Sequence, residues 1–224
     1  MNDGFPWFPL MIVAGVLLFF GARRWLSEVE QTKRAIRSIP RTPIRDVRDG
    51  ELVRVVGKLR YLAEPTVAPL SGRRCAYFEA RAFEKQGRSG LIERAMEGGG
   101  VEFLVEDETG RAIVDPVMLR AAVVEDVKSQ SGIWMEPSER MEAFLTRHAL
   151  ATTGALGLNK AIFYREGVFE EGETIAVVGL GTSELDASER TSMSGYRSRS
   201  MRLRISAPAD GQVLISDHPS VTKA

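Results

Sequence analysis

The chain is poor in the residues that build disulfides and metal centres. Its 224 residues include one cysteine, Cys75, and two histidines. A single cysteine excludes an intramolecular disulfide and any cysteine-rich metal site, and this fits a reducing compartment. No histidine stands near Cys75 to activate its thiol, so we expect a small structural residue there. The sequence therefore predicts no catalytic residue, no metal and no cofactor.

An excess of either charge is also missing. Thirty basic side chains balance thirty acidic ones, and the formal net charge is +0. A dedicated nucleic-acid binder usually shows a clear basic excess. The composition therefore argues against a nucleic-acid partner, although it does not exclude acidic partners.

Long apolar runs are missing after residue 22, but one stands at the start of the chain. Residues 4–22 carry no charge. As a helix this run would reach roughly 27 Å, close to the ~30 Å hydrocarbon core of a bilayer. We expect an uncleaved, single-pass membrane anchor. The alternatives are a cleaved signal peptide and a buried core helix, although Asp3 stands where a signal peptide has its basic region.

The anchor has a predicted orientation because basic residues follow it and none precedes it. Cytoplasmic flanks of membrane spans are rich in Lys and Arg. Arg23 and Arg24 therefore place the N-terminus outside and the main domain in the cytoplasm. A helix is expected to continue from the bilayer to residue 39 and to end at Pro40 and Pro43. The domain is expected to pivot on residues 23–39.

Alternation of apolar and polar residues predicts strands in the rest of the chain. Strands are expected at residues 52–62, 75–83, 101–107, 111–116, 161–169, 173–181, 201–206 and 211–216. A bulge or a sharp coil is expected at Gly57, inside the first of them. Helices are expected at residues 137–150, with an apolar face, and at residues 91–96. Short strands at this spacing favour a mainly β fold with minor α, either an OB-like or small β-barrel or a sandwich.

The chain divides into four predicted segments. They are an anchor (1–25), a juxtamembrane helix and linker (26–43), a β-rich domain (44–216) and a tail (217–224). Residues 183–200 have almost no apolar content and cannot offset their ordering entropy, so we expect a mobile insert. The tail, including His218, is expected to be frayed and solvated.

Four stretches, in a fixed order, resemble one known family. They read IRDVRDGELVRVVGKL from Ile44, VAPLSGRRCAYF from Val67, FLVEDETGRAIVDP from Phe103 and YREGVFEEGETIAVVG from Tyr164. Together they resemble the GIDE domain, also called the beside-a-membrane domain, of the mitochondrial ubiquitin ligases MULAN or MAPL and of prokaryotic relatives. The resemblance covers most of residues 44–216. It implies structural roles for the motif residues Pro69, Leu70, Cys75, Asp107, Gly110, Asp115, Pro116, Glu166, Gly167, Gly172 and Gly179.

The chain departs from the eukaryotic ligases of this family. Their domain lies between two transmembrane helices, and a RING finger follows the second. A RING needs eight Cys or His ligands for two zinc ions, whereas this chain has one cysteine and two histidines. The resemblance therefore implies a RING-less, singly anchored relative of prokaryotic type, without ligase chemistry of its own.

Two basic stretches are candidates for binding an anion or a partner. The first is a loop of four residues: Ser71, Gly72, Arg73 and Arg74. Its backbone amides and guanidinium groups could hold an anion, and a β-turn with solvated arginines is the alternative. The second stretch could face an anionic membrane surface, with a solvated loop as the alternative, and it contains Arg190, Arg197, Arg199, Arg202 and Arg204.

These observations predict a membrane-anchored, non-enzymatic binding or scaffold module. Its expected partner is a protein or peptide at the cytoplasmic face. One alternative is an accessory component related to E3 ubiquitin ligases. Another is an OB-like barrel that binds an oligonucleotide or another anion, for which Tyr61, Tyr77, Phe83 and Phe103 would supply aromatic rings. The third is an enzyme, for which the sequence shows neither a nucleophile with its base nor a metal set.

Overall fold

The computed structural model describes residues 28–86, 90–132, 135–151, 160–185 and 201–223 of the chain. Within these ranges no helix combines the length and the apolar character that crossing a bilayer requires. The anchor predicted over residues 1–25 lies outside the described residues and stays a prediction. Arg197 and Arg199 lie outside them as well.

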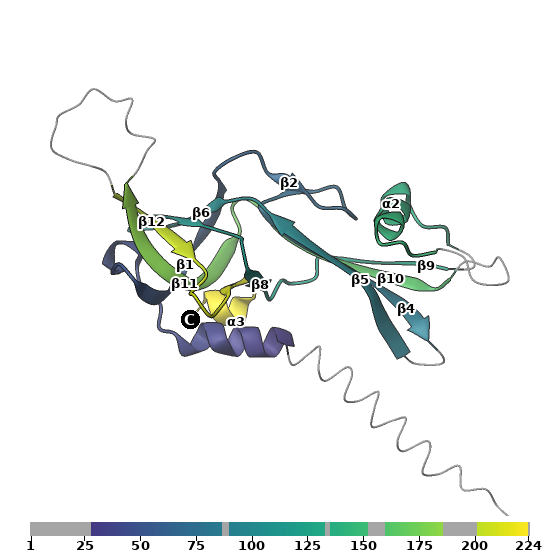
Figure 1. Ribbon diagram of the computed structural model, residues 1–224, viewed down its shortest axis with the longest axis horizontal. Helices are drawn as coiled ribbons and strands as arrows, with labels where there is room; N and C mark the ends of the chain where they lie inside the picture. Colours follow the sequence, from purple (N-terminus) through teal and green to yellow (C-terminus); the bar gives the residue numbers. More distant parts are fainter. Residues whose placement is uncertain (1–27, 87–89, 133–134, 152–159, 186–200, 224) are drawn as a thin grey trace, which may run out of the picture.

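Five strands close into a barrel (Figure 1). In chain order they are β1 (Glu51–Tyr61), β6 (Phe103–Asp107), β7 (Gly110–Val114), β11 (Thr174–Leu185) and β12 (Met201–Ser206). Around the barrel the order is β1, β6, β7, β12, β11 and back to β1. The β7–β12 pair is parallel and the other four pairs are antiparallel. The mainly β fold and the small barrel predicted from the strand spacing are confirmed.

The barrel closes because β1 pairs along both of its edges. Residues Glu51–Lys58 pair with β11, and residues Lys58–Tyr61 pair with β6. Gly57 stands at this change of partner, where a Cβ would lie 2.4 Å from the carbonyl oxygen of Glu106. A side chain at this position would therefore push the two strands apart. Gly57, where a bulge or a sharp coil is expected from the sequence, thus lies where the barrel closes, and the β1–β11 register runs through it without a bulge.

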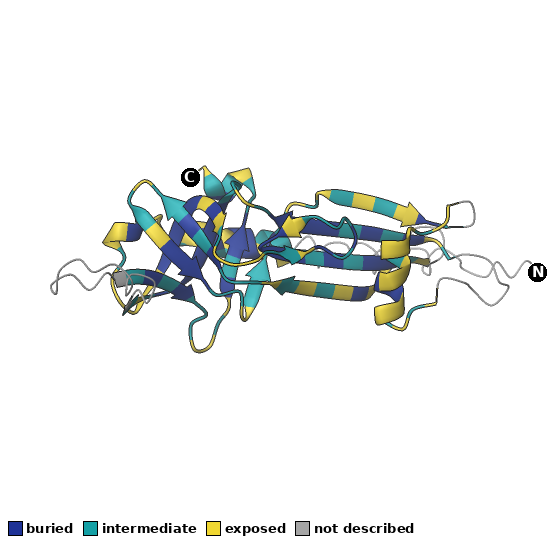
Figure 2. Cartoon of the chain, turned by 90° about the horizontal axis from the view of Figure 1, so that it is seen from above, coloured by how far each residue is buried: buried dark blue, intermediate teal, exposed yellow. Residues whose placement is uncertain are grey.

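Apolar side chains that alternate along the barrel strands fill its interior. Val53, Val55 and Leu59 of β1 have exposed fractions of 1%, 0% and 0%. They pack against side chains from the other strands, among them Val105, Ala112, Val114, Ile175, Val177, Leu203 and Ile205. This interior is dark blue in Figure 2. The core follows from the period of two in the sequence, because successive strand side chains point to opposite faces.

A second sheet of four antiparallel strands extends from one end of the barrel (Figure 1). Its order is β5 (Gly90–Gly100), β4 (Tyr77–Gln86), β10 (Ile162–Phe169) and β9 (Val127–Ser131). Strands β4 and β5 come from the segment between β1 and β6, whereas β9 and β10 come from the segment between β7 and β11. The sheet therefore forms only when two distant segments pair with each other.

Helix α2 (Glu139–Arg147) covers one face of the second sheet. Ser138 caps its N-terminus by accepting a hydrogen bond from the backbone N–H of Met141, which satisfies one of the helix's free donors. Phe144 and Leu145 are fully buried against alternate residues of the sheet, and Met141 packs beside them. The helix and the apolar face predicted from the sequence are confirmed.

The barrel and the second sheet share a core where they join. Phe169, at the end of β10, pairs with Tyr77 at the start of β4, and their ring centroids are 5.9 Å apart. The N–H of Ala76 donates to the carbonyl oxygen of Phe169 at 2.8 Å. All three residues belong to the core cluster of the barrel, so the hydrophobic core of the barrel continues into the start of the second sheet.

Smaller elements complete the described fold. They are η1 (Ile44–Asp46), β2 (Thr66–Val67), β3 (Arg74–Cys75), β8 (Leu119–Ala121), β13 (Val213–Ser216) and α3 (Pro219–Thr222). Strand β13 pairs with β11 outside the barrel ring, and β8 pairs in parallel with β13. The sequence analysis missed β2, β8 and β9, which have two, three and five residues. Two or three residues leave no alternation to detect, and β9 reads VKSQS, with a single apolar residue.

The helix predicted at residues 91–96 is wrong. These residues and the three glycines after them form β5, which pairs with the whole length of β4. Pairing with β4 supplies hydrogen bonds that a short isolated helix lacks, so tertiary structure overrides the local preference.

The C-terminal tail is packed where the sequence predicts fraying. Val221 of α3 is fully buried, and the carboxylate of Asp217 accepts a hydrogen bond from the N–H of Val124 at 3.0 Å. His218, expected to be solvated, caps α3 by accepting a hydrogen bond from the N–H of Ser220. Residues 183–185, the start of the predicted mobile insert, belong to β11. Residues 186–200 lie outside the described part of the chain.

A helix over residues 28–38 lies against the barrel (Figure 1). Its Ile36 is fully buried with Val56 and Val221 in a third core cluster. The buried guanidinium of Arg54 in β1 donates to the carbonyl oxygens of Ile39 at 3.4 Å and Val221 at 2.5 Å, and so joins both terminal segments to the barrel. The predicted pivot on residues 23–39 is therefore wrong over residues 28–38.

Replacement of the Ile36 side chain should release this helix. We expect Ile36→Ala to lower the free energy of unfolding by about 2 to 4 kcal/mol, because it leaves a cavity in a core with no exposure. Gln31→Ala on the exposed side of the same helix should change it by less than about 0.5 kcal/mol. Denaturant unfolding followed by circular dichroism measures both, and equal effects would contradict the docking.

Candidate functional site

The backbone amides of the Ser71 loop bind a carboxylate of the chain itself, that of Glu166. Glu166 of β10 is 1% exposed. Its Oε1 accepts a hydrogen bond from the N–H of Leu70 at 2.7 Å, and its Oε2 accepts one from the N–H of Ser71 at 2.9 Å. The backbone amides proposed to bind an external anion are therefore already used, because a buried carboxylate requires such partners.

The arginines of the loop are paired as well. Arg73 forms an ion pair with Glu170 and another with Asp126 at 3.3 Å. Arg74 lies 2.6 Å from Glu64. The prediction that residues 71–74 form an open anion site is thus replaced by a structural role: the loop is fixed to the second sheet by carboxylates of the chain.

Most of the other motif residues lie in turns or in buried positions. Asp107 caps the β6–β7 hairpin, where its carboxylate accepts hydrogen bonds from the N–H groups of Ile44, Thr109 and Gly110. Partial burial opposes ionisation, but a hydrogen bond from the Thr109 hydroxyl at 2.6 Å and these backbone bonds outweigh it and hold the pKa of Asp107 below its ordinary value. Asp115 accepts a hydrogen bond from the N–H of Val117 in the turn that follows β7.

The remaining motif residues lie in loops or within strands. Pro69 and Leu70 lie in the loop before β3, Pro116 follows Asp115, Gly172 lies in the turn between β10 and β11, and Gly179 lies within β11. Cys75 is fully buried, and burial raises the pKa of its thiol to about 12. At neutral pH this thiol is protonated, as expected for a structural cysteine.

The second basic stretch can be followed only where it enters β12. Arg202 and Arg204 both pair with Glu184 of β11, at 2.5 Å and 2.9 Å, and Arg204 also pairs with Glu102. These cations support the β11–β12 pair. The other members of the stretch lie outside the described residues.

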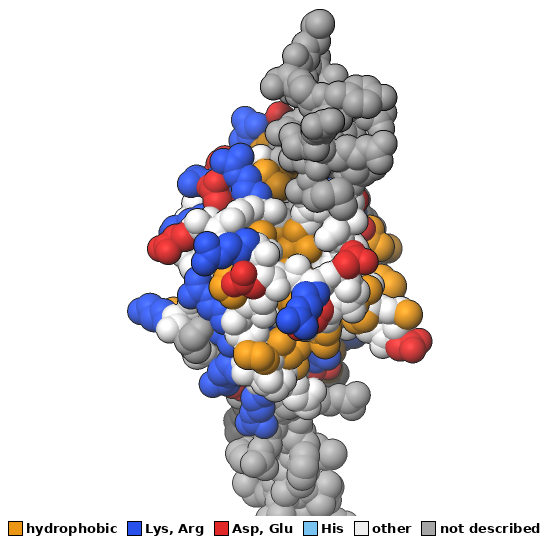
Figure 3. All heavy atoms as spheres, turned by 90° about the vertical axis from the view of Figure 1, so that its left-hand side faces the viewer, with side chains coloured by type: hydrophobic (Ala, Val, Ile, Leu, Met, Phe, Trp, Pro, Cys, Tyr) orange, Lys and Arg blue, Asp and Glu red, His pale blue; other side chains and the backbone are white. Residues whose placement is uncertain are grey.

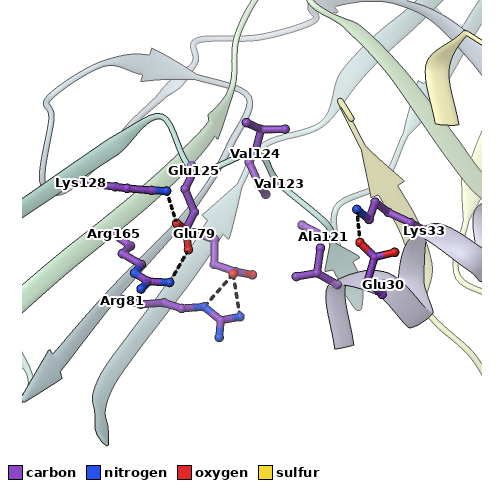
Figure 4. Close-up of a pocket in the computed structure, with 12 residues that line it drawn as sticks. Glu30, Lys33, Glu79, Arg81, Ala121, Val123, Val124, Glu125, Lys128 and Arg165 are labelled. Atoms are coloured by element: carbon purple, nitrogen blue, oxygen red, sulfur yellow. Dashed lines mark hydrogen bonds and ion pairs between the residues drawn. The ribbon is translucent and has the colours of Figure 1, made fainter. Parts of the chain in front are cut away.

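A charged groove lies on the face of the second sheet opposite α2 (Figure 4). Strand register places three cations side by side on this face: Arg165 of β10 stands directly opposite Arg81 of β4 and Lys128 of β9. We call Arg81, Arg165 and Lys128 the cationic row. Directly opposite residues of antiparallel strands have their Cβ atoms about 5 Å apart, so the three charges are close neighbours.

Carboxylates accompany the cationic row. Glu79 lies 2.7 Å from Arg81, which also pairs with Glu93 at 3.0 Å. Burial raises the pKa of Glu79, and the charge of Arg81 offsets this only in part. Glu125 is shared, with Arg165 at 3.1 Å and Lys128 at 3.2 Å. One carboxylate therefore serves two cations at the β9 side of the row.

The opposite wall of the groove is the helix over residues 28–38. Lys33 of this helix has a side chain only 10% exposed and pairs with Glu30. Apolar side chains, Val29, Ala121, Val123 and Val124, line the space between the walls, which has a volume of about 260 Å³. Figure 4 shows the ion pairs of the sheet on one side of this space and the Glu30–Lys33 pair on the other.

Gly167 lies beside the groove and is one of the motif residues. It pairs with Glu79 across the β4–β10 ladder. A Cβ on Gly167 would lie 2.5 Å from Cγ1 of Val123. The glycine therefore lets the segment between β8 and β9 pass close to the sheet, and this segment carries two of the apolar lining residues, Val123 and Val124.

Sequence reasoning missed this groove. The alternation of charged with small or aromatic residues in YFEARAF from Tyr77 was a signal that one face of β4 is polar. No signal in the sequence indicated that Arg81 would meet Arg165, because the register between the two strands is a tertiary property. Among the described residues, no group of three or more His, Cys, Asp or Glu side chains could hold a metal ion.

Comparisons of the chain with protein-family models, curated proteins and solved structures find no match. The resemblance to the GIDE domain therefore stays a prediction from the sequence motifs. The groove has no counterpart from which a ligand could be transferred, and its chemistry must be argued from its own residues.

Removal of the charge on Glu166 should loosen the Ser71 loop. We expect Glu166→Gln to lower the free energy of unfolding by about 1 to 3 kcal/mol, because one amide N–H₂ replaces an acceptor and faces a backbone donor. Glu171→Gln, a nearby exposed carboxylate, should have almost no effect. Denaturant unfolding tests the pair, and a neutral Glu166→Gln would show that the loop does not depend on the carboxylate.

Proposed function

We propose that the chain is a membrane-tethered, non-enzymatic binding module that holds its groove beside a bilayer. The observation that carries this proposal is the docking of the helix over residues 28–38. The described part of this helix begins six residues after the apolar run of residues 4–22, and Ile36 fixes it to the barrel. A bilayer that holds the run would therefore also hold the groove, since the same helix forms one of its walls.

Binding suits the site better than catalysis does. The charged groups of the groove are engaged in ion pairs, and the Cys75 thiol is buried with a pKa of about 12. A nucleophile needs an accessible group with a base within hydrogen-bond reach. The groove instead presents fixed charges of both signs around apolar side chains, as a recognition surface does.

The contacts among the motif residues support the proposal of a GIDE-like domain. Glu166, from the stretch that begins at Tyr164, accepts hydrogen bonds from Leu70 and Ser71 of the stretch that begins at Val67. Asp107, from the stretch that begins at Phe103, accepts one from Ile44, where the first stretch begins. The four stretches are thus joined in pairs by carboxylates, one buried (Glu166) and one partly buried (Asp107). We propose a RING-less, singly anchored relative of that family.

The tether can be tested by extraction and by labelling. The full chain should stay in membranes washed with alkaline carbonate, and a variant lacking residues 1–22 should be released. Cys75 is buried and gives little background, so an impermeant maleimide should label Asn2→Cys in intact spheroplasts. It should label Glu139→Cys only after permeabilisation. Release of the full chain would overturn the tether, and the reverse labelling would overturn the orientation.

A second candidate function comes from the barrel itself. Numbered along the chain, the barrel strands follow the order 1-2-3-5-4-1 with strands 3 and 5 parallel. We propose that this is an OB-type barrel, a fold that binds oligonucleotides on its second and third strands. Two arginines beside these strands share one carboxylate, because Glu106 of β6 lies 3.0 Å from Arg60 of β1 and 2.7 Å from Arg111 of β7. Figure 3 shows basic and acidic side chains interspersed over the barrel end of the molecule.

Because Arg60 and Arg111 are both paired with Glu106, we expect no binding of single-stranded DNA at micromolar protein. Fluorescence anisotropy of a labelled single strand at low and at moderate salt measures this. Saturable binding that weakens steeply with salt would favour the oligonucleotide function instead.

A further inference from the structure

Two neighbouring aliphatic side chains are exposed in the turn that follows β7. Val117 is 67% exposed and Met118 is 61% exposed, more than any other large apolar side chain of the described residues. Leu52, near the start of β1, is 48% exposed and lines a groove together with Met118. We call Leu52, Val117 and Met118 the apolar patch. Apolar side chains that are exposed together indicate a surface that a partner covers.

The backbone holds Met118 in a conformation that favours glycine. Its φ is 56°, in the left-handed region, where a Cβ crowds the following carbonyl oxygen. Two hydrogen bonds fix the turn: the carboxylate of Asp115 accepts one from the N–H of Val117 at 2.9 Å, and the carbonyl oxygen of Met118 accepts one from the N–H of Val213 at 3.1 Å. The fold thus presents an exposed methionine where a glycine would be less strained, and such strain is typical of functional positions.

A second, apolar groove of about 680 Å³ begins at the patch. Ile39, Val178 of β11 and Leu214 of β13 are among the side chains that line it. Among the described residues of its lining none is Lys or Arg, and Asp210 is the one acid. The patch and this groove therefore suit an apolar partner, because they offer no cation to an anionic one.

The helix over residues 28–38 connects the patch with the predicted anchor. Ala35 of this helix lines the apolar groove, as Met118 does. Arg120, two residues after Met118, donates to the carbonyl oxygen of Glu28 at 3.4 Å. Six residues lead from Ala22, the end of the apolar run, to Glu28, and six residues span at most about 21 Å. A bilayer that holds the run therefore lies within reach of the patch.

The small size of the patch favours a bilayer over a protein partner. A stable protein interface buries about 800 Å² on each partner, and three side chains do not supply this area. A tether keeps the patch at a high effective concentration beside the bilayer, so a weak contact is enough. Apolar side chains gain free energy when they leave water for the boundary between headgroups and acyl chains.

We propose that Leu52, Val117 and Met118 insert into the surface of the bilayer that holds residues 4–22. This contact rests on the proposed tether and gives the tethered domain a fixed orientation. The start of the helix over residues 28–38 leads to the anchor and its other end borders the apolar groove, so the helix then lies along the membrane surface. The contact depends on apolar side chains and not on charge. It should therefore form on zwitterionic phosphatidylcholine and persist at high salt.

The test uses the full chain in phosphatidylcholine liposomes, with a fluorescent NBD label on one introduced cysteine. Cys75 is buried and takes up little label. Doxyl-labelled phosphatidylcholine should quench a label on Met118→Cys at least about twofold, because interfacial side chains lie ~5–10 Å deep at the boundary of headgroups and acyl chains. Iodide in the buffer should quench this label little. Adding Val117→Asp, at a side chain that is 67% exposed, should return the label to water and keep the fold.

Leu62→Cys is the matched control. Leu62 is also aliphatic and is 42% exposed, and it follows the far end of β1, ten residues after Leu52. Iodide should quench a label at this position and the doxyl lipid should not. Equal lipid quenching at Leu62→Cys and Met118→Cys would overturn the docking.

Two other results would also overturn the docking. A Met118→Cys label that iodide quenches freely lies in water, and a label shielded from both quenchers lies against protein. Flotation of the chain with the liposomes reports the tether separately. A chain that floats with its label in water keeps the tether and loses the docking, whereas a chain that does not float contradicts both.

Discussion

The pairing of β4 with β10 is the constraint on which the functional part of this structure depends. It joins one insertion of the barrel to another, and its register sets Arg165 against Arg81 and Glu166 against Ala80. One face of that ladder thereby acquires the cationic row, and the other carries the Glu166 carboxylate to the Ser71 loop. A slip of one residue would exchange these faces, because strand side chains alternate. The groove and the Ser71 loop therefore both depend on the same strand register.

The two faces of the second sheet stabilise charged side chains differently, one with backbone N–H groups and the other with ion pairs. On the α2 side, Glu166 is buried and its charge is met by backbone N–H groups, which makes the loop a fixed part of the fold. On the groove side, the ion pairs are partly exposed and one carboxylate serves two cations. Exposed pairs contribute little to stability. The Lys128 side chain is 69% exposed, so its pair with Glu125 is one that folding does not require.

The sequence predicted much of the fold because most of its strands have a clear period of two. The barrel strands, the β6–β7 hairpin and the apolar face of α2 were all predicted from local patterns. The helix expected at residues 91–96 failed because β5 is specified by its partner β4 and not by its own residues. The docking of Ile36 and the burial of Val221 were missed for a related reason: short terminal segments show no pattern until the barrel offers them a surface.

By itself, the sequence determined the strand pattern, the balance of charge, the lack of a RING ligand set and the apolar run of residues 4–22. Those properties are local or compositional and need no knowledge of which strands meet. Only the tertiary structure decided that the Ser71 loop is occupied by Glu166, that the helix over residues 28–38 is docked, and that Arg81, Arg165 and Lys128 form a row. Each of these depends on contacts between residues that the chain separates widely, and such contacts are fixed by register and packing across the whole domain.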